Sequence, residues 1–360
     1  MKHYPIQLLL IITLFYGCAS ETLLPFDILL KDGPQYDSTY KVTQEFDLKG
    51  KTIVLPNNCR LVFREGGSIK NGTIIGNNTK IQFSNPFIGD SVTIRGCYVI
   101  GKRVIKDIDV FQAVFHTQKE IQTMFDISGG IKLVFSKGTY NNVEKIRVNN
   151  DIEADFCNST IQLFYDKEHV GECFYMEPWV NKGIDFFKIS NLKIQGKRNG
   201  FSGSKTSRRC IQLFYVSEVL FNNISIDQYY GGPEEYVIGD LLDKRRIGTS
   251  SISIMKYDKC TINNCHINDV DKEIFWCVPN VNPNNITYFT NNKSTCTSKS
   301  GSYSFFTILD GRCIVKNNEV YNYNGSALNV FCYDSEICNN RFYNGKRSIA
   351  IDLSEGTMTT

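Results

Sequence analysis

Residues 219–226 read VLFNNISI and contain a pattern of apolar residues around an asparagine. An apolar residue, Phe221, is followed two positions later by Asn223 and three positions after that by Ile226. Asparagine tolerates a positive φ better than most residues. Asn223 therefore predicts a tight bend between two short strands, with the flanking apolar side chains pointing inward.

The same spacing recurs along the chain. Its central residues are Asn71, Asn158, Asn191, Asn223, Asn264, Asn317 and Asn339, with Gly96 in an eighth copy. The shortest intervals, 22 and 25 residues, suit one coil of a parallel β-solenoid. Coils would lie about 4.8 Å apart, close enough for the amides to form a single hydrogen-bonded ladder. We expect a structural role for these asparagines rather than sugar binding, since a laddered amide has used its hydrogen bonds.

Composition supports strands over helices. The chain has 360 residues, 42% hydrophobic and 12% aromatic, and contains 33 Asn but only 5 Ala. The net charge is +3. These values exclude a disordered chain and a nucleic-acid protein that works by bulk charge.

The N-terminus predicts export. Lys2 and His3 precede an apolar run from Ile6 to Phe15, which is too short for a bilayer span and is typical of a signal peptide. Gly17-Cys18 resembles a lipoprotein cleavage site, so Cys18 is the predicted lipid attachment point and the only membrane contact. Simple secretion and an uncleaved start are the alternatives.

The thirteen cysteines lack the spacing of a zinc site or of a small disulfide scaffold, and no C-x-x-C pair occurs. We expect the remaining twelve to be buried as small apolar residues.

A helix is predicted where Thr117 and Glu120 form a capping box, with Gly129-Gly130 ending it. The strand Leu133–Tyr140 follows. Together with the Asn repeat, this order resembles the right-handed parallel β-helix proteins of the pectin-lyase-like superfamily. Residues 51–81, KTIVLPNNCRLVFREGGSIKNGTIIGNNTKI, resemble β-helix surface lipoproteins of Bacteroides-type gut bacteria.

The resemblance implies an all-β fold: a right-handed parallel β-helix, or solenoid, whose N-terminal end is plugged by a short helix. The expected organisation is a signal peptide at 1–18, a linker at 19–45, N-terminal β coils at 46–115, a capping helix at 116–130, the main β-helix at 131–353 and a tail at 354–360.

In this family a groove over the first strand of each coil binds polysaccharide. The asparagine register places those strands at Arg209–Phe214, Ser251–Met255, Ser304–Ile308, Ala327–Phe331 and Ser348–Asp352. Alternation sends one set of side chains inward: Ile211, Leu213, Ile252, Ile254, Phe306, Ile308, Leu328 and Val330. The outward set, a polar and largely uncharged groove floor, is Gln212, Ser253, Thr307, Asn329 and Ala350, with Asp352 near its end.

Acidic residues in the neighbouring turn are the main candidates for chemistry. Asp258, Asp310 and Asp334 precede their asparagines by six, seven and five residues. Stacked in a column, they would bind Ca²⁺ or raise the pKa of one carboxyl for acid catalysis. The alternative is that each Asp only stabilises its own turn.

Two long insertions, 227–249 and 268–302, are expected to overhang the groove. Tyr229, Tyr230 and Trp276 would stack on sugar rings. Lys244, Arg245 and Arg246 would pair with uronate or sulfate groups. The alternatives are aromatic side chains packed on the solenoid and a solvated charge run.

Function stays open at this level. The catalytic motifs of polygalacturonases and pectate lyases are missing, and a fold alone assigns no activity. One hypothesis is an exported, surface-anchored protein that binds and cleaves an acidic polysaccharide, as a lyase or glycoside hydrolase, with Asp258, Asp310, Lys244, Arg245 and Tyr230 in catalysis. The other is a non-catalytic glycan-binding or structural lipoprotein.

Overall fold

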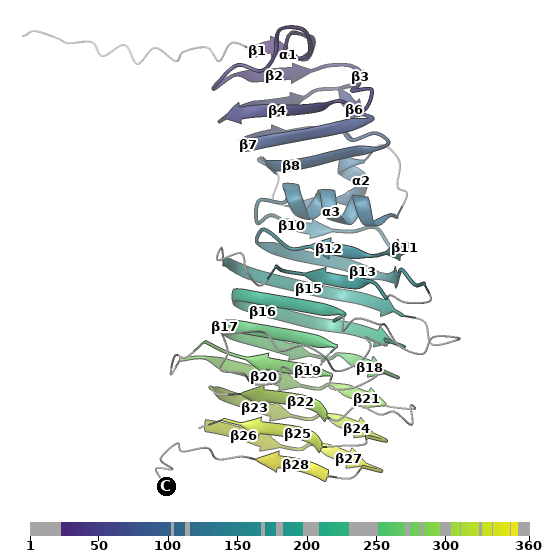
Figure 1. Cartoon of the computed structure of the whole chain (residues 1–360), viewed down its shortest axis with the longest axis vertical. Coiled ribbons are helices and arrows are strands. Elements are labelled where there is room, and N and C mark those ends of the chain that lie inside the picture. Colours follow the sequence, from purple (N-terminus) through teal and green to yellow (C-terminus); the bar gives the residue numbers. More distant parts are fainter. Residues whose placement is uncertain are drawn as a thin grey trace, which may run out of the picture.

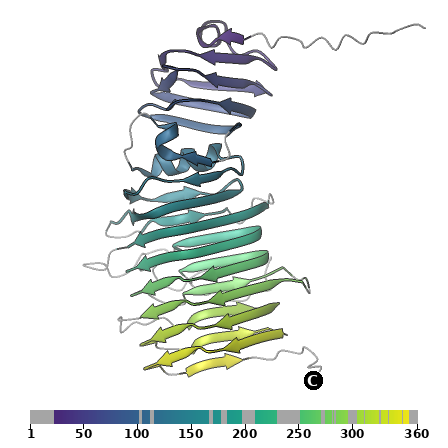
Figure 2. The ribbon, with the colours of Figure 1, turned by 180° about the vertical axis from the view of Figure 1, so that it is seen from behind.

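The chain folds into a tall stack of strands (Figure 1 and Figure 2). This computed structural model describes residues 23–101, 104–111, 116–166, 170–177, 183–196, 209–229, 251–270, 274–280, 282, 284–295, 304–309, 311–323, 326–332, 334–345 and 347–351. Within them the protein is predominantly β, and every pairing between named strands is parallel. No helix in these ranges is long and apolar enough to cross a bilayer.

The N-terminal group of elements begins inside the predicted linker. It comprises β1 (Leu23–Pro25), α1 (Phe26–Asp32), β2 (Thr39–Val42), β3 (Glu45–Asp47), β4 (Thr52–Asn57), β5 (Arg60–Phe63), β6 (Ser68–Lys70), β7 (Gly72–Gln82) and β8 (Val92–Val99). Next come β9 (Val104–Lys106), α2 (Asp107–Val110) and α3 (Gln118–Ile127).

The main group of strands continues from the helix to the end of the described chain. Its strands are β10 (Lys132–Val134), β11 (Thr139–Val143), β12 (Lys145–Arg147), β13 (Ile152–Leu163), β14 (Glu172–Tyr175), β15 (Ile184–Gln195), β16 (Ile211–Asp227), β17 (Ile252–Asn263), β18 (His266–Asn268), β19 (Phe275–Val278), β20 (Ile286–Thr290), β21 (Lys293–Thr295), β22 (Ser304–Leu309), β23 (Arg312–Lys316), β24 (Glu319–Tyr321), β25 (Ser326–Phe331), β26 (Asp334–Cys338), β27 (Arg341–Tyr343) and β28 (Arg347–Ile351).

Three parallel ladders run down this main group. Ladder A pairs β12, β14, the start of β16, the start of β17, β19, β22, β25 and β28. Ladder B passes through β10, β13, β15, β16, β17, β20, β23 and β26, and ladder C through β11, β13, β15, β16, β18, β21, β24 and β27. This pattern is consistent with a β-solenoid.

The core lies between the ladders and is built from alternating side chains. All the residues predicted to point inward are buried, among them Leu213, Ile254 and Leu328 with no exposed surface. Aromatic rings stack from one level to the next: Phe135 lies 4.4 Å from Phe156, at an interplanar angle of 3°. The predicted inward face is confirmed.

The predicted bends are confirmed as well. Asn71, Asn158, Asn191, Asn223, Asn264, Asn317 and Asn339 all have φ between 53° and 60°, and Gly96 has φ 62°. In the main group, Asn223 Nδ2 donates to Asn191 Oδ1 at 2.8 Å. Asn71 instead donates to Asp47 in the N-terminal group at 3.1 Å. The expected column of amides is therefore interrupted: Asn71 bonds to Asp47, and in the main group Asn191 Nδ2 donates to Asp155 Oδ1 at 2.9 Å.

A second asparagine ladder lies one residue further along the chain and is more buried than the first. Asn292, Asn318 and Asn340 stack in this position, and Asn318 has no exposed surface. The Asn318 side-chain nitrogen donates to the Phe289 carbonyl at 2.9 Å and to Asn340 Oδ1 at 2.8 Å. Its Oδ1 accepts from the Asn292 backbone at 2.9 Å and side chain at 3.0 Å. Cys265 holds the equivalent position one coil earlier.

The predicted insertion 268–302 is wrong, because it contains a complete coil. β19, β20 and β21 add one strand to each ladder. Asn291 makes the bend, with φ 57°. The repeat template missed it because Ser294, which is buried, stands where the other copies have an apolar residue.

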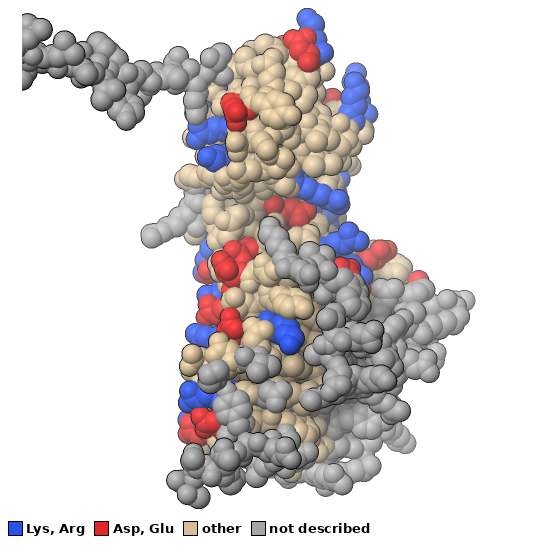
Figure 3. Space-filling view, turned by 60° about the vertical axis from the view of Figure 1, so that its left-hand side comes forward, with Lys and Arg blue, Asp and Glu red and all other residues tan. Residues whose placement is uncertain are grey.

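Charged side chains follow one another along an edge of the stack (Figure 3). Glu218 joins Lys188 at 2.5 Å and Lys259 at 3.2 Å, so opposite charges alternate on consecutive strands of ladder B. The described cysteines form no disulfide and most are buried, as expected.

Replacing Asn318 by Ala should lower the free energy of unfolding by about 2–4 kcal/mol, since each buried polar group left unsatisfied costs about 1–3 kcal/mol. Urea unfolding followed by circular dichroism measures the change. Asn317→Gly is the matched control, because it keeps the positive φ and removes only an exposed bond to Asn291. Equal losses in the two variants would contradict the role given to the buried ladder.

Candidate functional site

Helix α3 interrupts the stack between β8 and β12, where ladder A has no strand above it (Figure 1). Gln118 and Gln122, one turn apart, complete the hydrogen bonding of the exposed β12 edge. Gln118 donates to the Lys145 carbonyl and accepts from the Glu144 amide, both at 2.6 Å. Gln122 accepts from the Arg147 amide at 2.8 Å and donates to its carbonyl at 3.0 Å. Two side-chain amides thus replace a missing strand.

Both ends of the helix are fixed. The predicted capping box is present: Thr117 Oγ1 accepts from the Glu120 amide at 3.4 Å, and the Thr117 amide donates to Glu120 Oε2 at 2.8 Å. At the other end, Asn150 Nδ2 donates to the Asp126 carbonyl at 3.3 Å. The family resemblance placed this helix at the end of the solenoid, but it lies between two groups of strands, with β8 packed against it.

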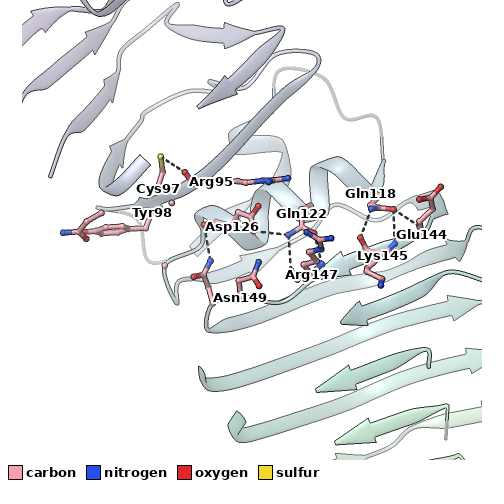
Figure 4. A pocket seen from close by; sticks show the side chains of 14 residues that line it. Arg95, Cys97, Tyr98, Gln118, Gln122, Asp126, Glu144, Lys145, Arg147 and Asn149 are labelled. Carbon is pink, nitrogen blue, oxygen red and sulfur yellow. Dashed lines mark hydrogen bonds between the residues drawn. The ribbon is translucent and has the colours of Figure 1, made fainter. Parts of the chain in front are cut away.

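A cleft of about 970 Å³ opens beside the helix (Figure 4). Its walls come from the segment Arg95–Tyr98 of β8, from α3, and from the segment Glu144–Asn150. The lining is mostly polar and comes from elements far apart in the sequence.

Two arginines face the cleft from opposite walls. Figure 4 shows Arg95 on the β8 side of the helix and Arg147 on the β12 side, with Gln122 and Asp126 between them. Both arginines are exposed, and within the described residues neither forms a salt bridge. Lys145 differs from these arginines because its Nζ forms a salt bridge with Glu172 at 2.5 Å. The same Nζ lies 4.0 Å from the centre of the Tyr175 ring.

Asp126 is the acidic group at the centre of the cleft. Burial raises the pKa of its carboxyl from 3.8 to about 6, against the opposing effects of a hydrogen bond from Gln122 and the charges of Arg95 and Arg147. Its place in the last turn of α3 also disfavours a negative charge, because the helix dipole is negative there. The carboxyl therefore changes charge close to neutral pH.

The predicted carboxylate column is not formed by the described residues. Asp258 accepts from Asn280 Nδ2 at 2.8 Å, and Asp334 pairs with Arg312 at 2.7 Å. In the strand register, Asp334 lies in the same row as Arg312 and Lys259. Asp258 precedes Lys259 and therefore lies in the adjacent row. The two carboxylates thus lie in different rows, and no group of three acidic, His or Cys residues in the described ranges could hold a metal ion.

Several predicted site residues lie outside the described ranges. They are Cys18, Tyr230, Lys244, Arg245, Arg246 and Asp310.

The residues of the predicted groove floor are aligned in one row, but several of them are buried and do not line an open groove. Gln212, Ser253, Trp276, Thr307 and Asn329 pair in sequence along ladder A. Trp276 belongs to strand β19, so its placement on an overhanging loop is wrong. Gln212, Ser253 and Thr307 are buried, as is Tyr229. Exposure depends on what packs over the strand face, which alternation alone does not reveal.

Sequence reasoning missed Arg95, Asp126 and Arg147. One signal was present: Gln118, Gln122 and Asp126 follow one another at four-residue spacing, which puts three polar groups on one helix face. Nothing in the sequence placed β8 and β12 on either side of that face.

Asp126→Asn should stabilise the protein at pH 7.5 by about 1–3 kcal/mol, and this gain should shrink towards pH 4. The folded protein holds the Asp126 proton more tightly than the unfolded chain. Its contribution is therefore fully present below pH 4 and is lost as the pH rises through about 6. Urea unfolding of wild type and variant at both pH values measures the difference.

Asp334→Asn is the control, since it removes an exposed carboxylate and should change stability by less than about 1 kcal/mol at pH 7.5. A stability difference for Asp126→Asn that does not vary with pH would contradict the raised pKa.

Comparison of the chain with protein-family models, with curated proteins and with solved structures found no match, so the geometry of the cleft has to carry the functional argument.

Proposed function

We propose that the protein is an exported right-handed parallel β-helix that binds an acidic glycan, with the α3 cleft as the binding site. Export rests on the signal-like N-terminus, and surface anchoring through Cys18 belongs to the same proposal. The handedness follows from the resemblance in the sequence, and the parallel ladders with bends at asparagine support it.

The observation that carries the proposal is the pair of arginines across α3. A guanidinium binds a carboxylate or sulfate through two parallel hydrogen bonds. Arg95 and Arg147 have no salt-bridge partner in the described residues, and they line a cleft large enough for a short oligosaccharide. Asn149 and Tyr98 add a hydrogen-bonding amide and an aromatic ring. This is the chemistry that an acidic sugar requires.

Binding fits the cleft better than cleavage does. Glycoside hydrolases place two carboxyl groups roughly 5–9.5 Å apart. Here Asp126 and the Gln118 end of the cleft, where Glu144 lies, are separated by two helical turns, or about 12 Å along the axis. Within the described residues no calcium ligand set is present to stabilise the enolate of a lyase reaction. The non-catalytic alternative is therefore the one proposed.

Arg95→Ala and Arg147→Ala should each weaken binding of oligogalacturonate or a sulfated oligosaccharide about 10- to 100-fold, because a charge-assisted hydrogen bond contributes about 1.5–3 kcal/mol. Isothermal titration calorimetry gives the Kd. Arg341→Ala, an exposed arginine in β27 far from the cleft, is the matched control and should bind as wild type does.

The same samples test for cleavage. Absorbance of unsaturated uronides would report lyase action, and new reducing ends without it would report hydrolysis. Equal affinity for neutral and acidic oligosaccharides, or no binding of either, would overturn the proposal. Turnover of any polymer would replace the non-catalytic reading with the enzymatic one.

A further inference from the structure

The cleft places one titratable carboxyl between two fixed positive charges. Arg95 lines the cleft from β8 and Arg147 from β12, while Asp126 itself comes from α3 (Figure 4). An arginine stays protonated at every physiological pH. The charge of the trio therefore depends on Asp126 alone.

We propose that protonation of Asp126 sets the affinity of the cleft for anions, so that acidic glycans bind more tightly in mildly acidic surroundings. This inference rests on the proposed function and adds its regulation. An ionised Asp126 neutralises part of the field of the two guanidiniums and repels an incoming sulfate or carboxylate. A protonated Asp126 leaves that field intact, and its hydroxyl becomes a hydrogen-bond donor to the ligand.

Hydrogen bonds around Asp126 restrict the movement of its neighbours. Gln122 Nε2 donates to Asp126 Oδ1 at 3.0 Å, while Gln122 Oε1 accepts from the Arg147 backbone amide. These two bonds fix the orientation of the Gln122 side-chain amide. The carboxyl lies in the last turn of α3, whose carbonyls are held by Asn150 and Ser128. These bonds hold the end of α3 that carries Asp126.

The other charged and titratable groups around Asp126 come from β8, from the β12 side and from α3 itself. From β8 the neighbours are Arg95, Tyr98 and Cys97, and burial raises the pKa of the Cys97 thiol to about 12. From the β12 side they are Arg147, Lys145 and Glu144, of which Lys145 is paired with Glu172.

On α3 itself, the Glu120 carboxylate is buried in the capping box. Lys119 is the remaining charged group of the helix, and burial lowers the pKa of its amine below the ordinary value. The ordinary lysine value is far above neutral, at about 10.4.

By linkage, the effect is reciprocal. An anion that binds the protonated form better must also raise the pKa of Asp126 when it binds. Binding near pH 6.5 should therefore take up protons from the buffer. With Asp126 mostly neutral at pH 5 and ionised at pH 7.5, the expected change in affinity is about five- to tenfold, after allowing for screening by salt.

The test uses the full chain and sucrose octasulfate, whose sulfate charges do not change between pH 5 and 7.5. Calorimetry at both pH values, in buffers of different ionisation enthalpy, gives Kd and proton uptake. Wild type should bind about five- to tenfold more tightly at pH 5, with net proton uptake near pH 6.5. Asp126→Asn should bind with the tighter affinity at both pH values and take up no protons.

Two controls make the outcome specific. His116, which packs edge-on against Tyr140 with the ring centroids 4.9 Å apart, lies outside the residues that line the cleft, and His116→Gln should keep the pH dependence. Neutral sucrose should not bind at either pH. Binding that is unchanged between pH 5 and 7.5, or an Asp126→Asn variant that keeps the full pH dependence, would overturn the inference while leaving the glycan proposal intact. Absence of octasulfate binding at every pH would overturn the proposed function itself.

Discussion

Each strand at the edge of a coil must find hydrogen-bond partners on the next level. Within the ladders the next strand supplies them. At the bends, where the chain turns too sharply for strand pairing, the side-chain amides of Asn292, Asn318 and Asn340 supply them instead. At α3, Gln118 and Gln122 do the same for β12. Carboxamide side chains are suited to both places because each carries a donor and an acceptor, as a peptide group does.

The cleft is a consequence of the same constraint. A helix can satisfy the edge of β12 through two glutamines, but it cannot match the width and flatness of a strand. The space left beside it is lined by whatever β8 and β12 present outward, which here is Arg95 and Arg147. Asp126 lies in the last turn of α3 and lines the cleft together with these two arginines. Site and scaffold thus share a single cause, the replacement of a strand by a helix.

Surface charges have a different role along the ladders. Each outward side chain meets its neighbour on the next strand, so alternating Lys and Glu favour one register and oppose a slip. Exposed pairs of this kind add little stability. The arginines at the α3 cleft, which form no salt bridge with any described residue, stand out against this background, because most other described charges on the ladders have an opposite charge beside them.

Local pattern determined the bends, the inward face and the capped helix. A positive φ at asparagine, the alternation of a strand and a capping box are all fixed by residues within a few positions of each other. Tertiary structure alone decided the rest. The repeat pattern missed the coil at β19–β21 because Ser294 is buried where the other copies have an apolar residue. Gln212, Ser253 and Thr307 of the predicted groove floor are buried, because exposure is not a local property. The trio of Arg95, Asp126 and Arg147 arises only from the stacking of β8, α3 and β12, and no spacing along the chain encodes which levels become neighbours.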